Sequence, residues 1–295
     1  MVRQGPAKPL SPVRIWVPPF LFFYQDKFML YLIATPIGNL GDITFRAIEV
    51  LKSCDYVLCE DTRHSAVLLS HYNIDTPRRS FHKFNEKQKE NEVIRDLQQG
   101  KNIALISDAG TPIISDPGMY LIQRCQEEDL EYTALPGPCA AIDALVLSAL
   151  EFNKFQFIGF LPKKKTELQN TLRAAESYQG VTICYESPQR LVKTLALINE
   201  KAIVTVAREL TKKFEEIRKG TSKELIEHFT NKPPKGEIVL IISPLEESQD
   251  WESLSPVEHV EEVMKGFDLS RKEAIKVVAQ IRGVSKSEIY NVVNN

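Results

Sequence analysis

The sequence reads Ser107-Asp108-Ala109-Gly110-Thr111-Pro112-Ile113-Ile114-Ser115-Asp116-Pro117-Gly118, and its first residue is also the last residue of a mostly apolar run at residues 103–107. A short apolar run is typical of a buried strand, and the glycines, prolines and aspartates after it are typical of a loop. In an open α/β sheet, ligands bind in the crevice outside the carboxyl ends of the strands. The segment therefore predicts a ligand-binding sheet edge, although a rigid turn with aspartate helix caps explains the same residues.

Apolar runs and helical spacing alternate on both sides of this loop, and this alternation predicts an α/β fold. In the first half, strands are predicted at residues 30–34, 56–59, 103–107 and 132–135, and helices at 45–53, 86–99, 120–127 and after Pro138. In the second half, strands are predicted at 155–159, 181–185, 202–207 and 238–242, and helices at 168–176, 190–198 and 223–229. We expect two α/β domains, at residues 29–150 and 151–243, the first with a mainly parallel sheet.

The two ends of the chain depart from this pattern. Residues 1–28 hold five prolines and six aromatic residues, which predicts a disordered extension with no fold of its own. A signal peptide is the alternative, but no cleavage-site pattern precedes the next strand. Residues 244–257 are acidic and predict a linker, and residues 258–295 predict a helical tail that resembles a helix-turn-helix pair broken at Gly283.

Composition excludes several classes of protein. The 295 residues carry a net charge of −2, so any site for a polyanion must be local. The five cysteines form no C-x-x-C pair, which predicts neither a disulfide framework nor a zinc site and favours a reducing, cytoplasmic compartment. The apolar stretch at residues 15–24 is about half the length that a membrane-spanning helix needs. We expect no metal and no membrane association.

Two more loops rich in proline and glycine follow predicted strands, at residues 34–42 and 135–141. Loops at successive strand ends converge on one face of a parallel sheet, and the small side chains of Cys139 and Ala140 leave room there for a flat ligand. The same small residues also suit helix packing. Because no G-x-G-x-x-G or G-K-[ST] motif is present, a Rossmann dinucleotide site and a P-loop are both disfavoured.

Charged clusters also end predicted strands. In the first half, Glu60, Asp61 and Arg63 suit the positioning or deprotonation of a hydroxyl, although Asp61 is equally suited to cap a helix. In the second half, the runs at residues 185–190 and 207–213 suit phosphate binding or pairing among their own charges. The loop Lys163-Lys164-Lys165 suits phosphate binding more strongly, or is simply a solvated lysine run.

Taken together and in this order, the motifs resemble those of the tetrapyrrole-methylase superfamily and, within it, of the bacterial enzymes that methylate small-subunit ribosomal RNA. The resemblance covers residues 30–295. It rests on T-P-I-G-N-L-G-D-I-T at residues 35–44, E-D-T-R at 60–63, S-D-A-G-T-P-I-I-S-D-P-G at 107–118, L-P-G-P-C-A-A at 135–141, G-F-L-P at 159–162, Y-E-S at 185–187, A-R-E-L-T-K at 207–212 and G-E-I-V-L at 236–240.

The resemblance implies two α/β domains with S-adenosylmethionine in the cleft between them, usually in a homodimer. The implied reaction is methylation of the ribose 2′-oxygen of a cytidine in the decoding region of small-subunit ribosomal RNA, free or in the assembled subunit. Candidate cofactor-binding residues are Pro36, Asp108, Gly110, Ile113, Ser115, Cys139, Ala140, Tyr185 and Ala207. Candidate catalytic residues are Glu60, Asp61, Arg63 and Glu209, and candidate RNA-binding residues are Lys163, Lys164, Lys165, Arg208, Lys212, Arg271 and Lys272.

Two other functions remain open on the sequence. A methylase of a porphyrin-like small molecule has the same cofactor loops but no use for the lysine loop or the helical tail. A non-catalytic RNA-binding module of the ribosome has no use for three convergent cofactor loops. Binding of S-adenosylmethionine distinguishes the module from the two enzymes.

Overall fold

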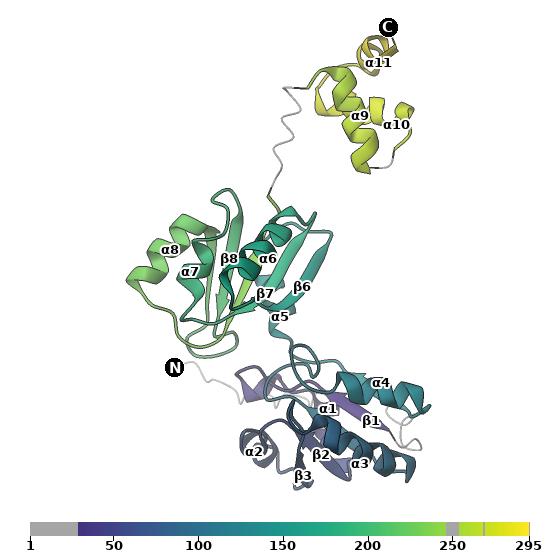
Figure 1. The fold of residues 1–295 in the computed structure, drawn as a ribbon, viewed down its shortest axis with the longest axis vertical. Coiled ribbons are helices and arrows are strands. Elements are labelled where there is room, and N and C mark those ends of the chain that lie inside the picture. The colour runs from purple at the N-terminus through teal and green to yellow at the C-terminus, as the bar shows by residue number, and fades with distance from the viewer. Residues whose placement is uncertain (1–28, 246–253, 268, 295) are drawn as a thin grey trace, which may run out of the picture.

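The computed structural model describes residues 29–245, 254–267 and 269–294, which form two α/β units followed by three helices (Figure 1). The predicted extension at residues 1–28 and most of the predicted acidic linker lie outside the described residues. Among the described residues, no helix combines the length and the apolar character that crossing a bilayer requires.

The first sheet has five parallel strands in the order β3-β2-β4-β1-β5. These are β1 (Leu30–Ile33), β2 (Tyr56–Cys59), β3 (Arg78–Ser80), β4 (Ile103–Ile106) and β5 (Tyr132–Leu135). The helices of this unit are η2 (Leu40–Asp42), α1 (Phe45–Ser53), α2 (Thr62–His71), α3 (Glu86–Gln98) and α4 (Met119–Glu127). Because all strands point the same way, the loops that follow them share one edge of the sheet.

Both faces of this sheet are buried, which explains why its central strands are continuously apolar. Along β4, Ala104 and Ile106 pack on one side with Leu51 of α1, whereas Ile103 and Leu105 pack on the other with Leu97 of α3. The period-two alternation of strand side chains divides the core in this way.

The second sheet is mixed, in the order β6-β7-β10-β8-β9. β6 and β7 are parallel, and β10 runs antiparallel to both of its neighbours, β7 and β8. The strands are β6 (Phe155–Phe160), β7 (Val181–Glu186), β8 (Ile203–Arg208), β9 (Glu216–Thr221) and β10 (Ile238–Ile242), and the helices are α6 (Lys165–Ser177), α7 (Leu191–Leu195) and α8 (Ser222–Asn231).

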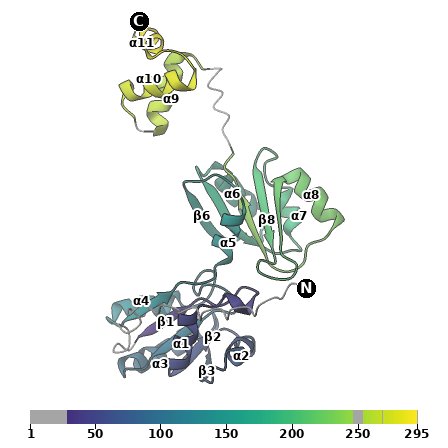
Figure 2. The same ribbon diagram turned by 180° about the vertical axis from the view of Figure 1, so that it is seen from behind.

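Helix α5 (Ala140–Leu147) joins the two units. It follows β5 in the chain, but Ala141, Ala144 and Leu145 pack against Ile183 and Ile241 of the second sheet. Figures 1 and 2, which view the molecule from opposite sides, both draw α5 between the two sheets. The division at residue 150 stays a prediction, and the packing of α5 makes the junction a continuous apolar core.

Helices α9 (Pro256–Phe267), α10 (Arg271–Ile281) and α11 (Lys286–Asn294) share a core of their own, which includes Val263, Val278 and Ile289. The predicted pair of helices corresponds to α10 and α11, and Gly283 between them has a φ of 64°. Helix α9 begins at Pro256, two residues before the predicted start of the tail.

Four elements have no counterpart in the sequence prediction, namely η2, α2, β3 and β9. β3 and β9 are edge strands, and their residues Arg78-Arg79-Ser80 and Glu216-Ile217-Arg218-Lys219-Gly220-Thr221 lack the apolar character of buried strands. Polar edge strands protect a sheet from pairing with other chains, so they carry little hydrophobic signal.

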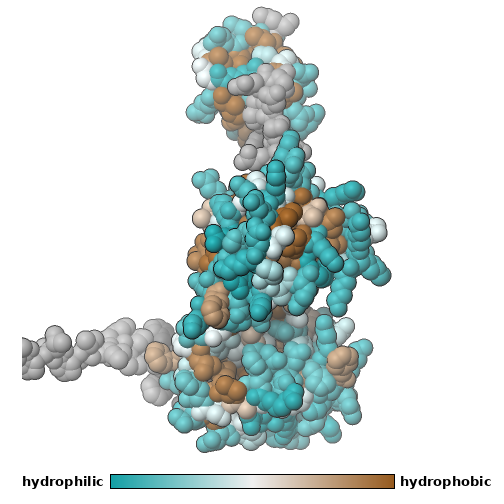
Figure 3. Space-filling model, turned by 90° about the vertical axis from the view of Figure 1, so that its left-hand side faces the viewer, coloured by the Kyte–Doolittle hydropathy of each residue, from teal (hydrophilic) through white to brown (hydrophobic). Residues whose placement is uncertain are grey.

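On the side drawn in Figure 3, brown hydrophobic patches interrupt the largely hydrophilic surface of both α/β units.

Candidate functional site

The three proline and glycine loops of the first unit are held together by hydrogen bonds at the carboxyl edge of the sheet. The N–H groups of Thr35 and Gly110 each donate to the other residue's carbonyl oxygen at 2.9 Å. The Thr111 hydroxyl donates to the Pro138 carbonyl oxygen at 3.1 Å, which ties the third loop to the second. The convergence predicted from the sequence is confirmed for these loops.

A fourth segment joins them at the end of β2. The backbone N–H of Asp61 donates to a carboxylate oxygen of Asp108 at 3.1 Å, so the E-D-T-R motif lies beside the central loop. Residues from four separate parts of the first unit therefore form one rigid rim.

The rim contains backbone conformations that L-amino acids seldom adopt. Ile113 and Ser115 have φ angles of 74° and 73°, and in the second unit Glu209 and Thr211 have φ angles of 51° and 63°. A positive φ is especially unfavourable for a β-branched residue such as Ile113. Strain of this kind clusters at ligand-binding sites, where surrounding structure holds it in place.

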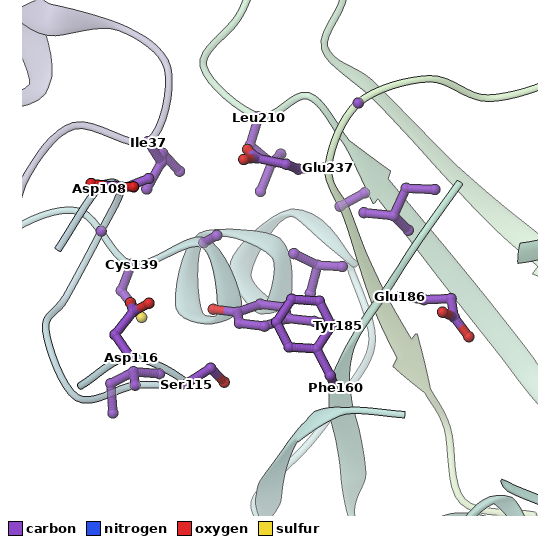
Figure 4. Close-up of a pocket in the computed structure, with 18 of the residues that line it drawn as sticks. Ile37, Asp108, Ser115, Asp116, Cys139, Phe160, Tyr185, Glu186, Leu210 and Glu237 are labelled. Carbon is purple, nitrogen blue, oxygen red and sulfur yellow. The ribbon is translucent and has the colours of Figure 1, made fainter. Parts of the chain in front are cut away.

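A cavity of about 480 Å³ lies between the two units. This volume lies within the range of small-molecule and cofactor pockets. Of the residues predicted to bind cofactor or to act in catalysis, those that line it are Glu60, Asp108, Gly110, Ser115, Cys139, Ala140, Tyr185 and Ala207. Figure 4 shows the loop residues facing Tyr185 and Phe160 across this space.

The remaining predicted residues lie outside the lining. Pro36 and Ile113 are neighbours in sequence of lining residues and do not line the cavity themselves. The cavity is also not lined by Asp61, Arg63, Glu209, Arg208, Lys212 or the three lysines at residues 163–165. Arg271 and Lys272 belong to α10, and the Arg271 guanidinium donates to the Val293 carbonyl oxygen within the helical tail.

The lining is acidic. Among the described residues that line the cavity, five carry carboxylates and none is a lysine, arginine or histidine. Glu186 is neutralised by an ion pair with Arg190 at 3.4 Å, and Glu237 by one with Lys212 at 2.8 Å. Glu60, Asp108 and Asp116 form no ion pair with any described residue, so the cavity favours a cationic ligand over an anionic one.

Asp116 has the most perturbed carboxyl group of the site. Burial, together with the negative charges of Glu60 and Asp108, raises the pKa of Asp116 to about 6. Both causes disfavour the charged form of a carboxyl group. A carboxylate with this pKa accepts a proton far more readily than one at the ordinary value, which suits a general base at neutral pH.

Asp61 has the opposite environment. Its carboxylate accepts hydrogen bonds from the Arg63 guanidinium and the Arg63 backbone N–H, which together lower the pKa of Asp61 to about 2. The same side chain is the N-cap of α2. Asp61 therefore caps a helix, as the alternative interpretation of the sequence has it, and its carboxylate forms an ion pair with Arg63 at 2.9 Å.

The charged run after β8 is also paired within the protein. Lys212 contacts Glu209 at 3.0 Å, and the backbone N–H of Glu237 donates to the same Glu209 carboxylate at 3.1 Å. Arg208 contacts Glu216 at 2.8 Å, and both side chains are only 12% exposed. These pairs hold the end of β8 and the loop after it in position.

We expect replacement of Arg208 with alanine to destabilise the protein by about 3 kcal/mol, because Glu216 is left buried without its main partner. Arg218 is the matched control, since it contacts the same Glu216 carboxylate at 3.1 Å but is 52% exposed. Its replacement with alanine should cost much less. Denaturant unfolding of both variants measures the difference, and equal losses would contradict a buried structural role for Arg208.

Sequence reasoning did not select Asp116 or Phe160, which are among the residues that line the cavity. Asp116 stands inside the quoted loop as its second aspartate, so its place in the motif was the available signal. Nothing in the sequence indicated that Glu60 and Asp108 would lie close enough to raise its pKa.

The architecture and the loops match those of a known protein family. A family model described as Tetrapyrrole (Corrin/Porphyrin) Methylases matches residues 29–226, which include both sheets except β10. The chain belongs to this family. The match includes every loop of the cavity rim except the segment at residues 236–239.

Several curated relatives of the chain share one name. A protein of Halalkalibacterium halodurans named Ribosomal RNA small subunit methyltransferase I is 45% identical over 91% of this chain and 95% of its own length. Proteins with the same name from Haemophilus influenzae and Bacillus subtilis are each 42% identical, over 89% and 90% of this chain and 95% and 94% of their own lengths.

Solved structures agree on the fold. A cobalt precorrin-4 methyltransferase superposes with a TM-score of 0.53 at 18% identity, covering 74% of this chain and 95% of its own. A uroporphyrin-III-C-methyltransferase from Thermus thermophilus also gives a TM-score of 0.53, at 14% identity, covering 76% of this chain and 98% of its own. The predicted fold class, two α/β domains of the tetrapyrrole-methylase type with a helical C-terminal region, is confirmed.

Proposed function

We propose that the protein is an S-adenosylmethionine-dependent enzyme that methylates the ribose 2′-oxygen of a cytidine in the decoding region of small-subunit ribosomal RNA. Membership of a methylase family and the names of the curated relatives support methyl transfer to this RNA. The observation that carries the proposal is the cavity lined by unpaired carboxylates between the two units.

The residues of the cavity fit S-adenosylmethionine, whose sulfonium and ammonium groups are cationic. Asp108 and Glu60 offer negative charge on one side, while Tyr185, Leu210 and Val239 offer apolar surface on the other. Burial, together with the negative charge of Asp116, raises the pKa of Tyr185 to about 12, so its phenol remains neutral. Gly110 lines the cavity, and because it has no side chain its backbone allows close approach of a ligand.

The bound sulfonium supplies an electrophilic methyl group, and the protein must position the hydroxyl and remove its proton. A ribose hydroxyl is a weak acid, so a proton acceptor assists as the oxygen becomes nucleophilic. We assign this role to Asp116, because it lines the cavity, forms no ion pair with a described residue and has a raised pKa. The negative charge of Glu60 helps to raise the pKa of Asp116. The carboxylates of Asp61 and Glu209 are less suited to the role, because they form ion pairs with Arg63 and Lys212.

The acidic cavity also constrains how RNA approaches. Phosphate groups are repelled by Glu60, Asp108 and Asp116, so only the target nucleoside enters while the backbone stays outside. The lysines at residues 163–165 are exposed and lie outside the lining, where they suit phosphate contacts. We propose small-subunit ribosomal RNA or the assembled subunit as the partner, in the cytoplasm.

We also propose that the protein acts as a homodimer. Helix α5 and the segment after it hold partly exposed apolar side chains, namely Ile142, Val146, Leu147, Phe152 and Phe155. Exposed apolar surface that gathers in one region is typical of an association site. The oligomeric state in solution, by light scattering, tests this part.

The two structural neighbours are named as methyltransferases of tetrapyrroles, which favours a porphyrin-like substrate, but at 14–18% identity they establish the fold alone. An anionic ring would also be repelled by the carboxylates of the cavity.

Two measurements test the proposal: calorimetric binding of S-adenosylmethionine, and mapping of ribose methylation on ribosomal RNA from cells with and without the protein. Absence of either signal would contradict it.

We expect removal of residues 254–295 to leave S-adenosylmethionine binding intact and to weaken binding to the small ribosomal subunit. The three tail helices have their own core and contribute no residue to the cavity. Residues 268–295, which include α10 and α11, carry five basic and three acidic side chains, whereas residues 254–267 carry one lysine and three glutamates. The expected contribution is therefore a few phosphate contacts at most, with a shallow salt dependence.

The double replacement of Lys272 and Lys276 with alanine separates recognition from packing, because both side chains are exposed on α10 and lie outside the tail core. It should weaken subunit binding without unfolding the tail. A truncated protein that binds the subunit normally but loses its dimer or its fold would assign the tail a structural role instead.

A further inference from the structure

Phe160 combines two properties that rarely occur together. Its side chain is 67% exposed, and yet it lines the cavity between the two units. In Figure 4 its ring lies beside that of Tyr185, with the ring centroids 5.3 Å apart and an angle of 62° between the planes. A large aromatic ring held in a fixed orientation at a cavity mouth is suited to stack on a planar group.

A β-bulge places Phe160 there. β6 pairs with β7 through Phe157 opposite Ile183 and Phe160 opposite Tyr185, so β6 has one residue more than β7 between these pairs. The extra residue lies at Ile158-Gly159, and Gly159 adopts a φ of 69°. Bulges that use a glycine in this conformation change the direction of the side chains that follow.

The bulge changes the face of the sheet on which Phe160 lies, because strand side chains alternate between the two faces. Phe157 packs on the face of the sheet that includes Ile183 and Tyr185, whereas Ile158 packs on the opposite face. In a regular strand Phe160 would share the face of Ile158. The bulge moves it to the face of Phe157, so that the two phenylalanines flank Tyr185 at 5.0 and 5.3 Å.

The lysine loop follows Phe160 directly and is held by Arg190. The guanidinium of Arg190 donates to the carbonyl oxygens of Leu161 and Pro162, and Glu186 fixes the guanidinium in turn. Lys164 contacts Glu167 at 3.0 Å, whereas Lys163 and Lys165 form no ion pair with any described residue. Two exposed positive charges thus stand three and five residues beyond the aromatic ring on a braced segment.

We propose that Phe160 is the stacking platform for the base of the target nucleotide, and that Lys163 and Lys165 hold the adjoining phosphates. This inference rests on the proposed function. Enzymes that modify one nucleotide take it out of its stack and read the base between aromatic or apolar side chains. Here the base stacks on Phe160 at the mouth, the phosphates remain outside with the lysines, and the ribose reaches the carboxylates within.

The test uses Phe160→Ala and Phe160→Tyr in the full-length protein, with small ribosomal subunits from cells that lack it as substrate. Loss of one stacked base should raise the KM for the subunit about 10-fold or more, and tyrosine should restore it. The Kd for S-adenosylmethionine, measured by calorimetry, should change less than about twofold if cofactor and base occupy separate places.

Phe214→Ala is the matched control, because Phe214 is 65% exposed in the same unit but does not line the cavity. It should leave both constants unchanged. Replacing Lys163 and Lys165 together with alanine should reduce the slope of log affinity for the subunit against log salt by about 1.4, which corresponds to two phosphate contacts with a single strand.

Two results would overturn the inference: an unchanged KM in Phe160→Ala, or a KM and a cofactor Kd that rise together, which would assign the ring to the cofactor. Failure of the proposed function is a separate outcome. In that case the unmodified protein itself would neither bind S-adenosylmethionine nor methylate the subunit.

Discussion

Replacement of Asp116 with asparagine is expected to lower the single-turnover rate of methyl transfer about 10²- to 10⁴-fold, the usual contribution of a general base. Asparagine keeps the shape of the side chain but does not accept the proton of the 2′-hydroxyl. S-adenosylmethionine binding, measured by calorimetry, should persist, because Glu60 and Asp108 remain. Glu60→Gln is the matched control, since it removes a neighbouring charge without removing the proposed proton acceptor.

The pH dependence follows from the same assignment. With the pKa of Asp116 raised to about 6, the single-turnover rate of the unmodified protein should fall as pH drops below about 6. Glu60→Gln should move this midpoint to lower pH, because it removes one of the two charges that raise the pKa. A rate that is independent of pH between 5 and 8, or an Asp116→Asn variant with an unchanged rate, would exclude Asp116 as the base.

The stability of Asp116→Asn provides an independent check. Because folding raises the pKa of Asp116 from 3.8 to about 6, the native state is favoured below pH 3.8 and loses that stability as pH rises through 6. The variant should therefore be more stable than the unmodified protein at pH 8 and equal to it near pH 3.5. The gain is about 1 kcal/mol after allowance for a partly exposed side chain, measured by denaturant unfolding.

Replacement of Gly110 with leucine is expected to abolish S-adenosylmethionine binding while the protein remains folded. Gly110 has a φ of 78°, and an added Cβ would lie 3.3 Å from Ile37 and 3.7 Å from the Pro138 carbonyl oxygen. Ile37 lines the cavity, so a larger side chain at this point occupies ligand space and pushes apart two of the convergent loops. Calorimetry measures the loss, and circular dichroism measures the fold.

Gly283→Leu is the control for backbone strain alone. Gly283 has a φ of 64°, similar to that of Gly110, but an added Cβ there meets nothing within 4 Å. A left-handed conformation costs an L-residue about 1–2 kcal/mol at either position. If folded Gly110→Leu bound S-adenosylmethionine as tightly as Gly283→Leu does, the cofactor would not occupy this cavity.

The buried strands, and the sheet edge at which the three loops meet, could be predicted from local sequence. Residues 56–59, 132–135 and 238–242 are strands with the predicted bounds, because a buried strand is recognisable from its own apolar side chains. The loops after β1, β4 and β5 were also predictable, since glycine and proline restrict the backbone locally and parallel strands bring their ends to one edge. Polar edge strands such as β3 carry no such local signal.

Which side chains share the cavity, which of them are ion-paired and what pKa Asp116 has depend on the tertiary structure. The pKa of Asp116 depends on Glu60, which is 56 positions earlier in the chain, and the direction of Phe160 depends on a bulge that exists only in register with β7. Arg208 and Lys212, which suited phosphate by sequence, are instead paired with Glu216 and Glu237. Charge pairing, desolvation and strand register act between residues distant in sequence, so they are set by folding and not by any local pattern.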